Sequence, residues 1–96
     1  MHKIEKYLKE INWSILYLGK RVERHPNGRS FHSDGTYTVE IYTIYKDSMK
    51  FQLRIKVSGR KDYTLWDGGK LEILTLSQGD FIREFKRYLD NINKEG

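Results

Sequence analysis

The most constraining feature of the sequence is a strict alternation of apolar and polar side chains between residues 50 and 57. Side chains of a β-strand point alternately to its two faces. One face of this strand would therefore be apolar, and the other polar and largely basic. Such a pattern is typical of an antiparallel sheet with one covered and one solvated face. The apolar positions are Phe51, Leu53, Ile55 and Val57, and the polar positions are Lys50, Gln52, Arg54 and Lys56.

Three further strands are predicted around this one. Residues 36–46 and 50–58 read as a hairpin joined by Asp47-Ser48-Met49. Short strands follow at Tyr63–Trp66 and Leu71–Leu76, separated by a turn that contains two glycines. The sequence therefore predicts a sheet of four antiparallel strands.

A C-terminal amphipathic helix follows the last strand. Ser77 is a suitable N-cap residue, and Asp80 lies three positions on, as in a variant of the capping box. An apolar stripe at helical spacing then indicates the face that packs on the sheet. Its members are Phe81, Phe85, Tyr88, Leu89 and Ile92.

The N-terminal segment from Lys3 to Arg24 has apolar residues at spacings of three and four, which predicts a helix. A second interpretation stays open, in which the helix breaks near Asn12. Residues 13–18 are rich in strand formers, and Gly19 could end a short strand there. The residues at helical spacing are Ile4, Leu8, Ile11, Ile15, Leu18 and Val22.

The predicted fold is therefore α+β, with an N-terminal helix, a four-stranded antiparallel sheet and a C-terminal helix packed on one sheet face. A chain of 96 residues is expected to form one small domain over residues 1–96. Residues 25–35 (HPNGRSFHSDG) are dense in turn formers and predict a long loop within it.

Composition excludes several classes of protein. The absence of cysteine excludes a disulfide framework, a thiolate zinc site and a cysteine nucleophile. No apolar run approaches the roughly 20 residues of a membrane-spanning helix, and the first residues lack the apolar core of a signal peptide. We therefore expect a cytoplasmic protein without membrane contact. The formal net charge of +5 is concentrated in residues 1–33 and 46–61.

A first candidate binding surface lies on the predicted N-terminal helix, opposite its apolar stripe. Basic side chains alternate there with aromatic ones, which suits a nucleic-acid strand because cations neutralise phosphates and rings stack on bases. The alternative is a solvated face whose aromatic residues pack beneath a loop or belong to a strand. The surface comprises Lys6, Lys9, Trp13, Tyr17, Lys20 and Arg24.

A second candidate surface is the polar side of the sheet. Arg54 and Lys56 are expected to neighbour Tyr42 on the preceding strand and Trp66 on the following one. Basic and aromatic side chains on a sheet face form a common platform for single strands. The alternative is that the charged residues only protect the sheet and keep it in solution.

Catalytic motifs are weak. His25 and His32 flank the predicted loop and Asp34 follows, but their spacing matches neither a metal site nor a hydrolase motif. Gly68-Gly69-Lys70 lacks the other residues of a phosphate-binding loop and reads as a hairpin turn. We therefore predict a protein that is not an enzyme and that has no cofactor or metal.

Residues 36–93 resemble the single-stranded-DNA-binding domain of the transcriptional positive-cofactor family. The resemblance rests on the basic strand 50–56 and on the strand-to-helix passage 69–77, followed by Phe81. It implies four antiparallel strands leading into one helix, dimerisation, and single-strand binding on a curved sheet. Arg54 and Lys56 would lie on that surface, with Trp66 as a further candidate. The N-terminal helix and the short third strand depart from the family pattern.

Two functions follow as expectations. The first is a non-enzymatic module that binds single-stranded DNA, RNA or a nucleoprotein complex, alone or as a homodimer. The second is a small protein inhibitor, of the kind that phages and other mobile elements use against host nucleases or defence complexes. Small size, a lack of motifs and a helix-plus-sheet plan like that of some anti-CRISPR proteins favour the second.

Overall fold

The computed structural model describes residues 1–24 and 35–95. Within them, two helices flank a five-stranded antiparallel sheet in which each strand pairs with its neighbour in the chain. The α+β layout with its two terminal helices is as predicted, but the sheet has five strands and not four. The elements are α1 (His2–Glu10), β1 (Ser14–Arg24), β2 (Thr36–Lys46), β3 (Met49–Lys56), β4 (Asp62–Asp67), β5 (Lys70–Thr75) and α2 (Gln78–Glu95).

The additional strand is β1, so the prediction of a helix over the whole of Lys3–Arg24 is wrong and the break near Asn12 is correct. Asn12 has a φ of 63°, in the left-handed region that asparagine tolerates better than most residues. The backbone N–H of Trp13 donates a hydrogen bond to the Leu8 carbonyl at 2.8 Å. The helix therefore ends, and the strand formers that follow extend along β2.

The sequence of β1 does not show the even alternation of apolar and polar residues that is typical of a strand. Its pairing with β2 shifts between Tyr17 and Gly19, where a bulge inserts Leu18. A bulge adds one residue to one strand only, so side chains beyond it exchange faces. The two halves of β1 therefore have opposite phases, and together their apolar residues imitate helical spacing.

The hairpin of β2 and β3 agrees closely with the sequence prediction. Two residues, Asp47 and Ser48, join the strands, and Asp47 has a φ of 54°. Phe51 lies opposite Ile44 and Leu53 lies opposite Tyr42. Residues directly opposite one another share a face, so this register decides which side chains lie together.

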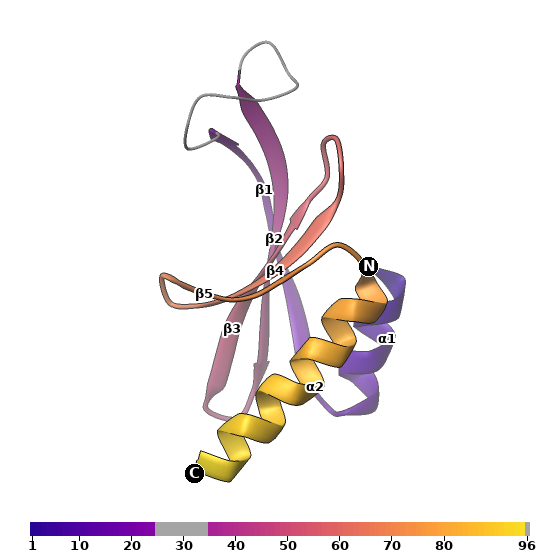
Figure 1. Cartoon of the computed structure of the whole chain (residues 1–96), viewed down its shortest axis with the longest axis vertical. Coiled ribbons are helices and arrows are strands. Elements are labelled where there is room, and N and C mark those ends of the chain that lie inside the picture. Colours follow the sequence, from indigo (N-terminus) through magenta and orange to yellow (C-terminus); the bar gives the residue numbers. More distant parts are fainter. Residues whose placement is uncertain (25–34, 96) are drawn as a thin grey trace.

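Both helices lie against one face of the sheet, which we call the helix face (Figure 1). Trp13 lies within the core there, with its ring centroid 6.0 Å from that of Phe51 and 5.3 Å from that of Phe85. These contacts join the segment after α1 to β3 and α2. The buried cluster comprises Ile4, Leu8, Trp13, Ile44, Phe51, Leu53, Ile55, Tyr63, Leu65, Ile73, Phe81 and Phe85.

The start of α2 also holds the start of α1. Ser77 caps α2 by accepting a hydrogen bond at its Oγ from the Asp80 backbone N–H, at 3.1 Å. Asp80 itself forms an ion pair with Arg83. The side-chain oxygen of Gln78 accepts hydrogen bonds from the backbone N–H groups of Lys3 and Ile4. These two N–H groups belong to the first turn of α1, where no carbonyl within the helix is available to them.

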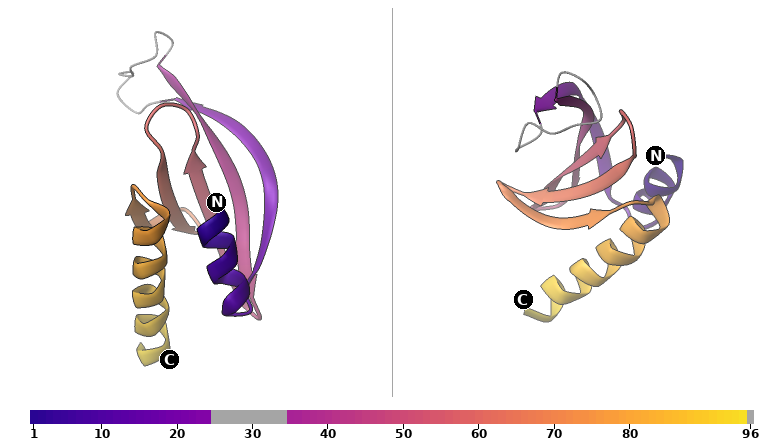
Figure 2. Two further views of the ribbon diagram at one scale, coloured as in Figure 1. Left: turned by 90° about the vertical axis from the view of Figure 1, so that its right-hand side faces the viewer. Right: turned by 45° about the horizontal axis from the view of Figure 1, so that its top comes forward.

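The opposite side of the sheet, which we call the open face, carries no helix. Figure 2 shows β1 and β2 bending beyond the ends of both helices. The register places on the open face the alternate residues Val39, Ile41 and Thr43 of β2, Gln52, Arg54 and Lys56 of β3, and Asp62, Thr64 and Trp66 of β4.

Candidate functional site

A hollow of about 210 Å³ lies on the open face, towards the end of the sheet that extends past the helices. We call it the charged pocket. Four neighbouring strands, β1 to β4, contribute to it, so it depends on the curvature of the sheet and not on a loop. Its lining residues are Glu23, Tyr37, Val39, Arg54, Lys56, Asp62, Thr64 and Trp66.

Arg54 and Trp66 form the aromatic wall of the pocket. The guanidinium carbon of Arg54 lies 4.9 Å from the centroid of the Trp66 ring, within the range of a cation–π interaction. The Trp66 indole N–H donates to Thr64 Oγ1 at 2.9 Å, and Thr64 Oγ1 donates to the Arg54 carbonyl at 3.2 Å. Arg54 also donates to Gln52 and lies 4.0 Å from a Glu23 oxygen. These contacts orient both side chains without a ligand.

The second cation of the pocket is Lys56. Its Nζ lies 5.7 Å from the centroid of the Tyr37 ring. Asp62 lies opposite Lys56 in the ladder. Burial raises the pKa of the Asp62 carboxyl, while the charge of Lys56 and a hydrogen bond from its backbone act in the opposite direction. With Glu23 and Arg54, the pocket thus contains two cations and two carboxylates.

Burial also raises the pKa of Tyr37, and the nearby carboxylates Glu23 and Asp62 raise it further, while Arg54 lowers it. The phenol is therefore neutral at physiological pH. Tyr37 contributes a flat ring and a hydroxyl group to the pocket, without adding a charge to it.

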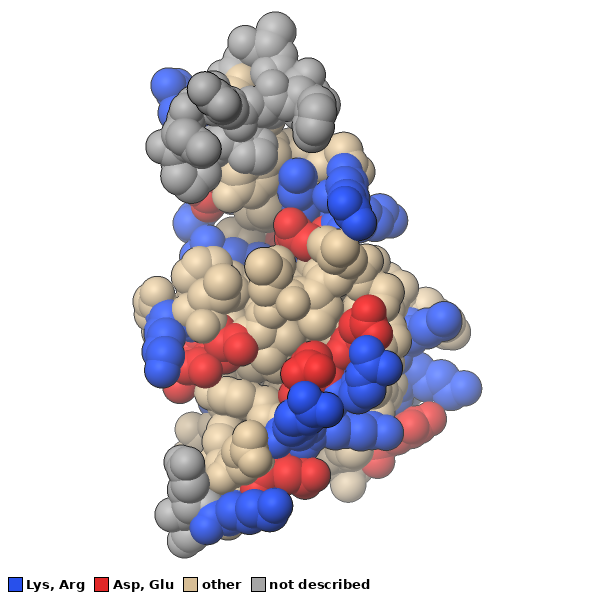
Figure 3. Space-filling model, viewed as in Figure 1, with Lys and Arg blue, Asp and Glu red and all other residues tan. Residues whose placement is uncertain are grey.

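The rim of the pocket is more basic than its interior. Arg21 lies beside Glu23 at 3.5 Å, with its side chain 59% exposed. Arg60 and Lys61 are exposed in the connection between β3 and β4. Figure 3 shows basic side chains gathered over this connection, at the upper right. Counted over both faces, this end of the sheet carries the basic residues Lys20, Arg21, Arg24, Arg54, Lys56, Arg60 and Lys61, against the acidic Glu23, Glu40 and Asp62.

Of the residues predicted for the polar sheet face, the structure brings Arg54, Lys56 and Trp66 together. Tyr42 does not join them, and its placement beside Arg54 is wrong. The ladder pairs Arg54 with Ile41 and places Tyr42 opposite Leu53, on the helix face. A shift of one residue moves a side chain to the other side of a sheet, and the sequence alone did not define this register.

The surface predicted on the N-terminal helix is divided between three places. Lys6 and Lys9 lie exposed on α1, whereas Trp13 is buried in the core at 6% exposure. The other three residues lie on β1. The helical face that would have united all six does not form, because α1 ends at Glu10.

The residues on β1 form a smaller group on the helix face. Tyr17 lies opposite Tyr42, with their ring centroids 5.1 Å apart. Lys20 lies opposite Glu40, and Arg24 lies opposite Thr36. This group faces away from the charged pocket, so the two predicted surfaces do not merge.

Sequence reasoning missed Glu23, Tyr37, Asp62 and Thr64. Thr64 lies within the predicted strand on the same face as Trp66, and Asp62 continues that alternation one residue before the predicted start. Glu23 requires the bulge in β1, which exchanges the faces of the residues after Leu18. Glu23 and Tyr37 could therefore be assigned to the pocket only from the register of the assembled sheet.

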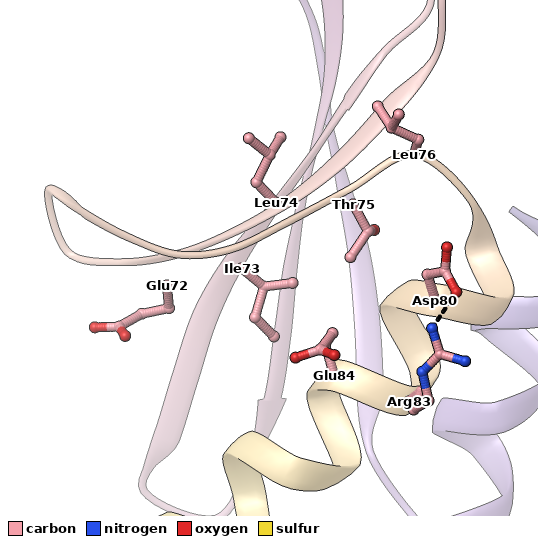
Figure 4. Close-up of a pocket in the computed structure, with 8 residues that line it drawn as sticks. All are labelled: Glu72, Ile73, Leu74, Thr75, Leu76, Asp80, Arg83 and Glu84. Carbon is pink, nitrogen blue, oxygen red and sulfur yellow. Dashed lines mark hydrogen bonds and ion pairs between the residues drawn. The ribbon is translucent and has the colours of Figure 1, made fainter.

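A second hollow, of about 410 Å³, lies where β5 meets the first turns of α2 (Figure 4). β5 is an edge strand of the sheet. Leu74 and Leu76 are 62% and 54% exposed beside the hollow. The figure shows Arg83 turned toward Asp80, with which it pairs. This hollow thus lies along an apolar strand edge and is bordered by charged side chains that pair with one another.

The described residues were also searched for metal-binding groups and for membrane-spanning helices. Residues 1–24 and 35–95 contain no group of three or more His, Asp or Glu side chains placed to hold a metal ion. Across the same residues, neither helix has the length and apolar character needed to cross a membrane. The predicted loop at 25–35, with His25, His32 and Asp34, lies outside the described residues except for Gly35.

Comparison with protein-family models, curated proteins and solved structures finds no match to this chain. The resemblance of residues 36–93 to the positive-cofactor family thus stays a prediction. Four strands leading into one helix occur in many folds, and the order β2–β5–α2 does not establish the family.

Proposed function

We propose that this protein is a non-enzymatic module that binds single-stranded nucleic acid across its open face. The observation that carries the proposal is the Arg54–Trp66 stack beside Lys56, next to the exposed basic residues Arg60 and Lys61. Flat side chains and cations on one sheet face are what an unpaired strand requires.

The proposed contacts differ in kind between the pocket and its rim. The cations inside the pocket already lie beside carboxylates, so they have limited capacity to neutralise phosphates. Arg60 and Lys61 lie in solvent at its edge, where phosphates can approach without desolvating a buried charge. We therefore assign backbone contacts to the rim and base contacts to the pocket.

The first test measures how binding depends on salt. Labelled 15-nucleotide DNA and RNA single strands, and a duplex, are titrated with the protein by fluorescence anisotropy at several salt concentrations. Arg60→Gln/Lys61→Gln should weaken binding and flatten the plot of log affinity against log salt by roughly 1.4, since each lost phosphate contact on a single strand contributes roughly 0.7. The control Lys9→Gln/Lys94→Gln removes the same charge from the helices and should leave the slope unchanged.

A companion variant separates stacking from charge. Trp66→Leu should weaken binding while preserving the salt slope, because it removes an aromatic surface and no cation. Stacking on an aromatic side chain contributes roughly 1–3 kcal/mol per base. An unchanged slope in the rim variant would reject the proposed phosphate contacts, and the absence of binding to every oligonucleotide at low salt would reject the function.

A second candidate function is protein binding, as expected of an inhibitor of a nuclease or defence complex. The observation in its favour is the apolar exposure at both sheet edges: Leu16, Leu18 and Val22 on β1, Leu74 on β5, and Leu76 directly after it. Strand edges pair readily with another chain. Substitution of Leu74 and Leu76 by Ser would impair this function and leave oligonucleotide binding intact. A cytoplasmic location and a homodimer stay predictions.

A further inference from the structure

The interior of the charged pocket is poorly suited to a phosphate group. Glu23 and Asp62 balance Arg54 and Lys56 there. A phosphate would therefore approach two carboxylates as well as two cations. A neutral ligand with both hydrogen-bond donors and acceptors matches such a lining better, because each charged group can find a partner of the opposite character.

The shape of the pocket points to a flat ligand of limited size. Its volume of about 210 Å³ is below the roughly 300–1,000 Å³ of pockets that hold drug-sized molecules. The Arg54 guanidinium already lies along the Trp66 ring, and bases of single strands stack on aromatic rings and on guanidinium planes. The pocket therefore has room and a stacking surface for one base.

We infer that the charged pocket receives one unstacked guanine base of the bound strand. Guanine presents acceptors at O6 and N7, which arginine and lysine recognise, and donors at N1 and N2, which a carboxylate can accept as a pair. Arg54 and Lys56 supply the cations, and Glu23 and Asp62 the carboxylates. This inference rests on the proposed function, because it specifies which base the open face recognises.

The other bases complement this lining less well. Thymine and uracil offer a single N–H donor, so a carboxylate cannot accept a pair of hydrogen bonds from them. Cytosine and adenine carry one amino group each and lack a second donor beside it. A carboxylate that accepts one hydrogen bond instead of a pair gains less from the base, so the pocket should discriminate against all four at this position.

The main experiment compares oligo-dT of 15 nucleotides with the same strand carrying one central G, A or C. Fluorescence anisotropy should show the G-containing strand binding roughly fivefold tighter or more than the others, the lower end of the discrimination given by one bidentate base contact. Equal affinity for all four strands would overturn the guanine inference and leave single-strand binding standing.

Variants of the carboxylates test the mechanism of the preference. Glu23→Gln/Asp62→Asn should abolish the advantage of G, because an amide offers one acceptor and not two. The variant should bind plain oligo-dT at least as well as the wild type, since it is more positive. Glu10→Gln/Asp90→Asn makes the same charge change on the helices and should keep the preference. Persistence of the preference in the pocket variant would overturn the inference.

A separate experiment tests the pocket without a strand. Free guanosine, compared with uridine, should selectively shift the NMR signal of the Trp66 indole N–H, identified by its loss in Trp66→Leu. Guanosine binding without oligonucleotide binding would support the pocket and reject the proposed strand function. Equal responses to guanosine and uridine would count against the guanine pocket.

Discussion

Trp13 shows how one residue can join three elements. Its ring lies between Phe51 of β3 and Phe85 of α2, and it follows α1 directly. Trp66, by contrast, is half-buried on the open face, where its ring lies beside the Arg54 guanidinium. Of the two tryptophans of the chain, Trp13 therefore stabilises the core and Trp66 belongs to the proposed site.

The contrast between the two tryptophans can be measured. Trp13→Ala should lower the free energy of unfolding by about 3–5 kcal/mol, as expected for removing a large buried aromatic side chain. Trp66→Ala should cost much less, because its ring is only partly removed from solvent. Urea denaturation of the two variants gives the comparison, and similar losses in both would contradict the assignment of Trp13 to the core.

Asp62 gives a prediction for pH dependence. Because burial raises its pKa in the folded state above the ordinary 3.8, folding disfavours its charged form. The folded protein therefore binds more protons than the unfolded chain between those two pKa values, and stability falls as the pH rises through this window. Asp62→Asn should not show this fall in stability, because an amide does not titrate.

The measurement is the difference in the free energy of unfolding between Asp62→Asn and the wild type. As the pH rises from below 3.8 to neutrality, Asp62→Asn should gain stability relative to the wild type. A change in the other direction would mean that Lys56, and not burial, dominates the environment of this carboxyl group. Glu10→Gln, on the exposed surface of α1, serves as the comparison.

At the scale of elements, the chain from β2 onward was predictable, whereas the end of α1 and the strand β1 were not. β3 alternates strictly, and Ser77 marks the start of α2, so local patterns were sufficient there. In β1, the bulge at Leu18 reverses the phase and conceals the strand. The break at Asn12 could be recognised only as an alternative, because positive φ at a single asparagine leaves no distinct sequence pattern.

The bulge in β1 depends on Gly19, whose φ is 132°. Other residues rarely adopt this conformation, so Gly19→Ala should destabilise the protein by about 1–3 kcal/mol through backbone strain. A clash is not the cause, since a Cβ at this position meets no atom within 4 Å. Gly69→Ala is the control, with equal space and ordinary φ. Thermal unfolding that shows equal effects of both substitutions would contradict this account of the bulge.

At the scale of the whole molecule, the candidate site requires the assembled sheet. Arg54, Lys56 and Trp66 could be proposed together from strand alternation. Glu23 reaches Arg54 only because the sheet bends and the β1 register shifts. The composition indicates a basic protein. The fold concentrates the excess positive charge at the end of the sheet that extends past the helices, whereas the pocket itself contains equal numbers of cations and carboxylates. The proposed division between phosphate and base contacts depends on that difference.

The hydrogen bonds between Gln78 and the first turn of α1 have a consequence for the order of folding. The strands form a meander, so most of their pairing links neighbouring segments and can form early. Gln78 and Lys3 are separated by 75 positions, which makes their contact among the most entropically demanding to close. With 9 residues, α1 is shorter than the roughly 12–15 that a helix needs to persist alone in water. The N-terminal helix should therefore form last, on a sheet and a second helix that are already in place.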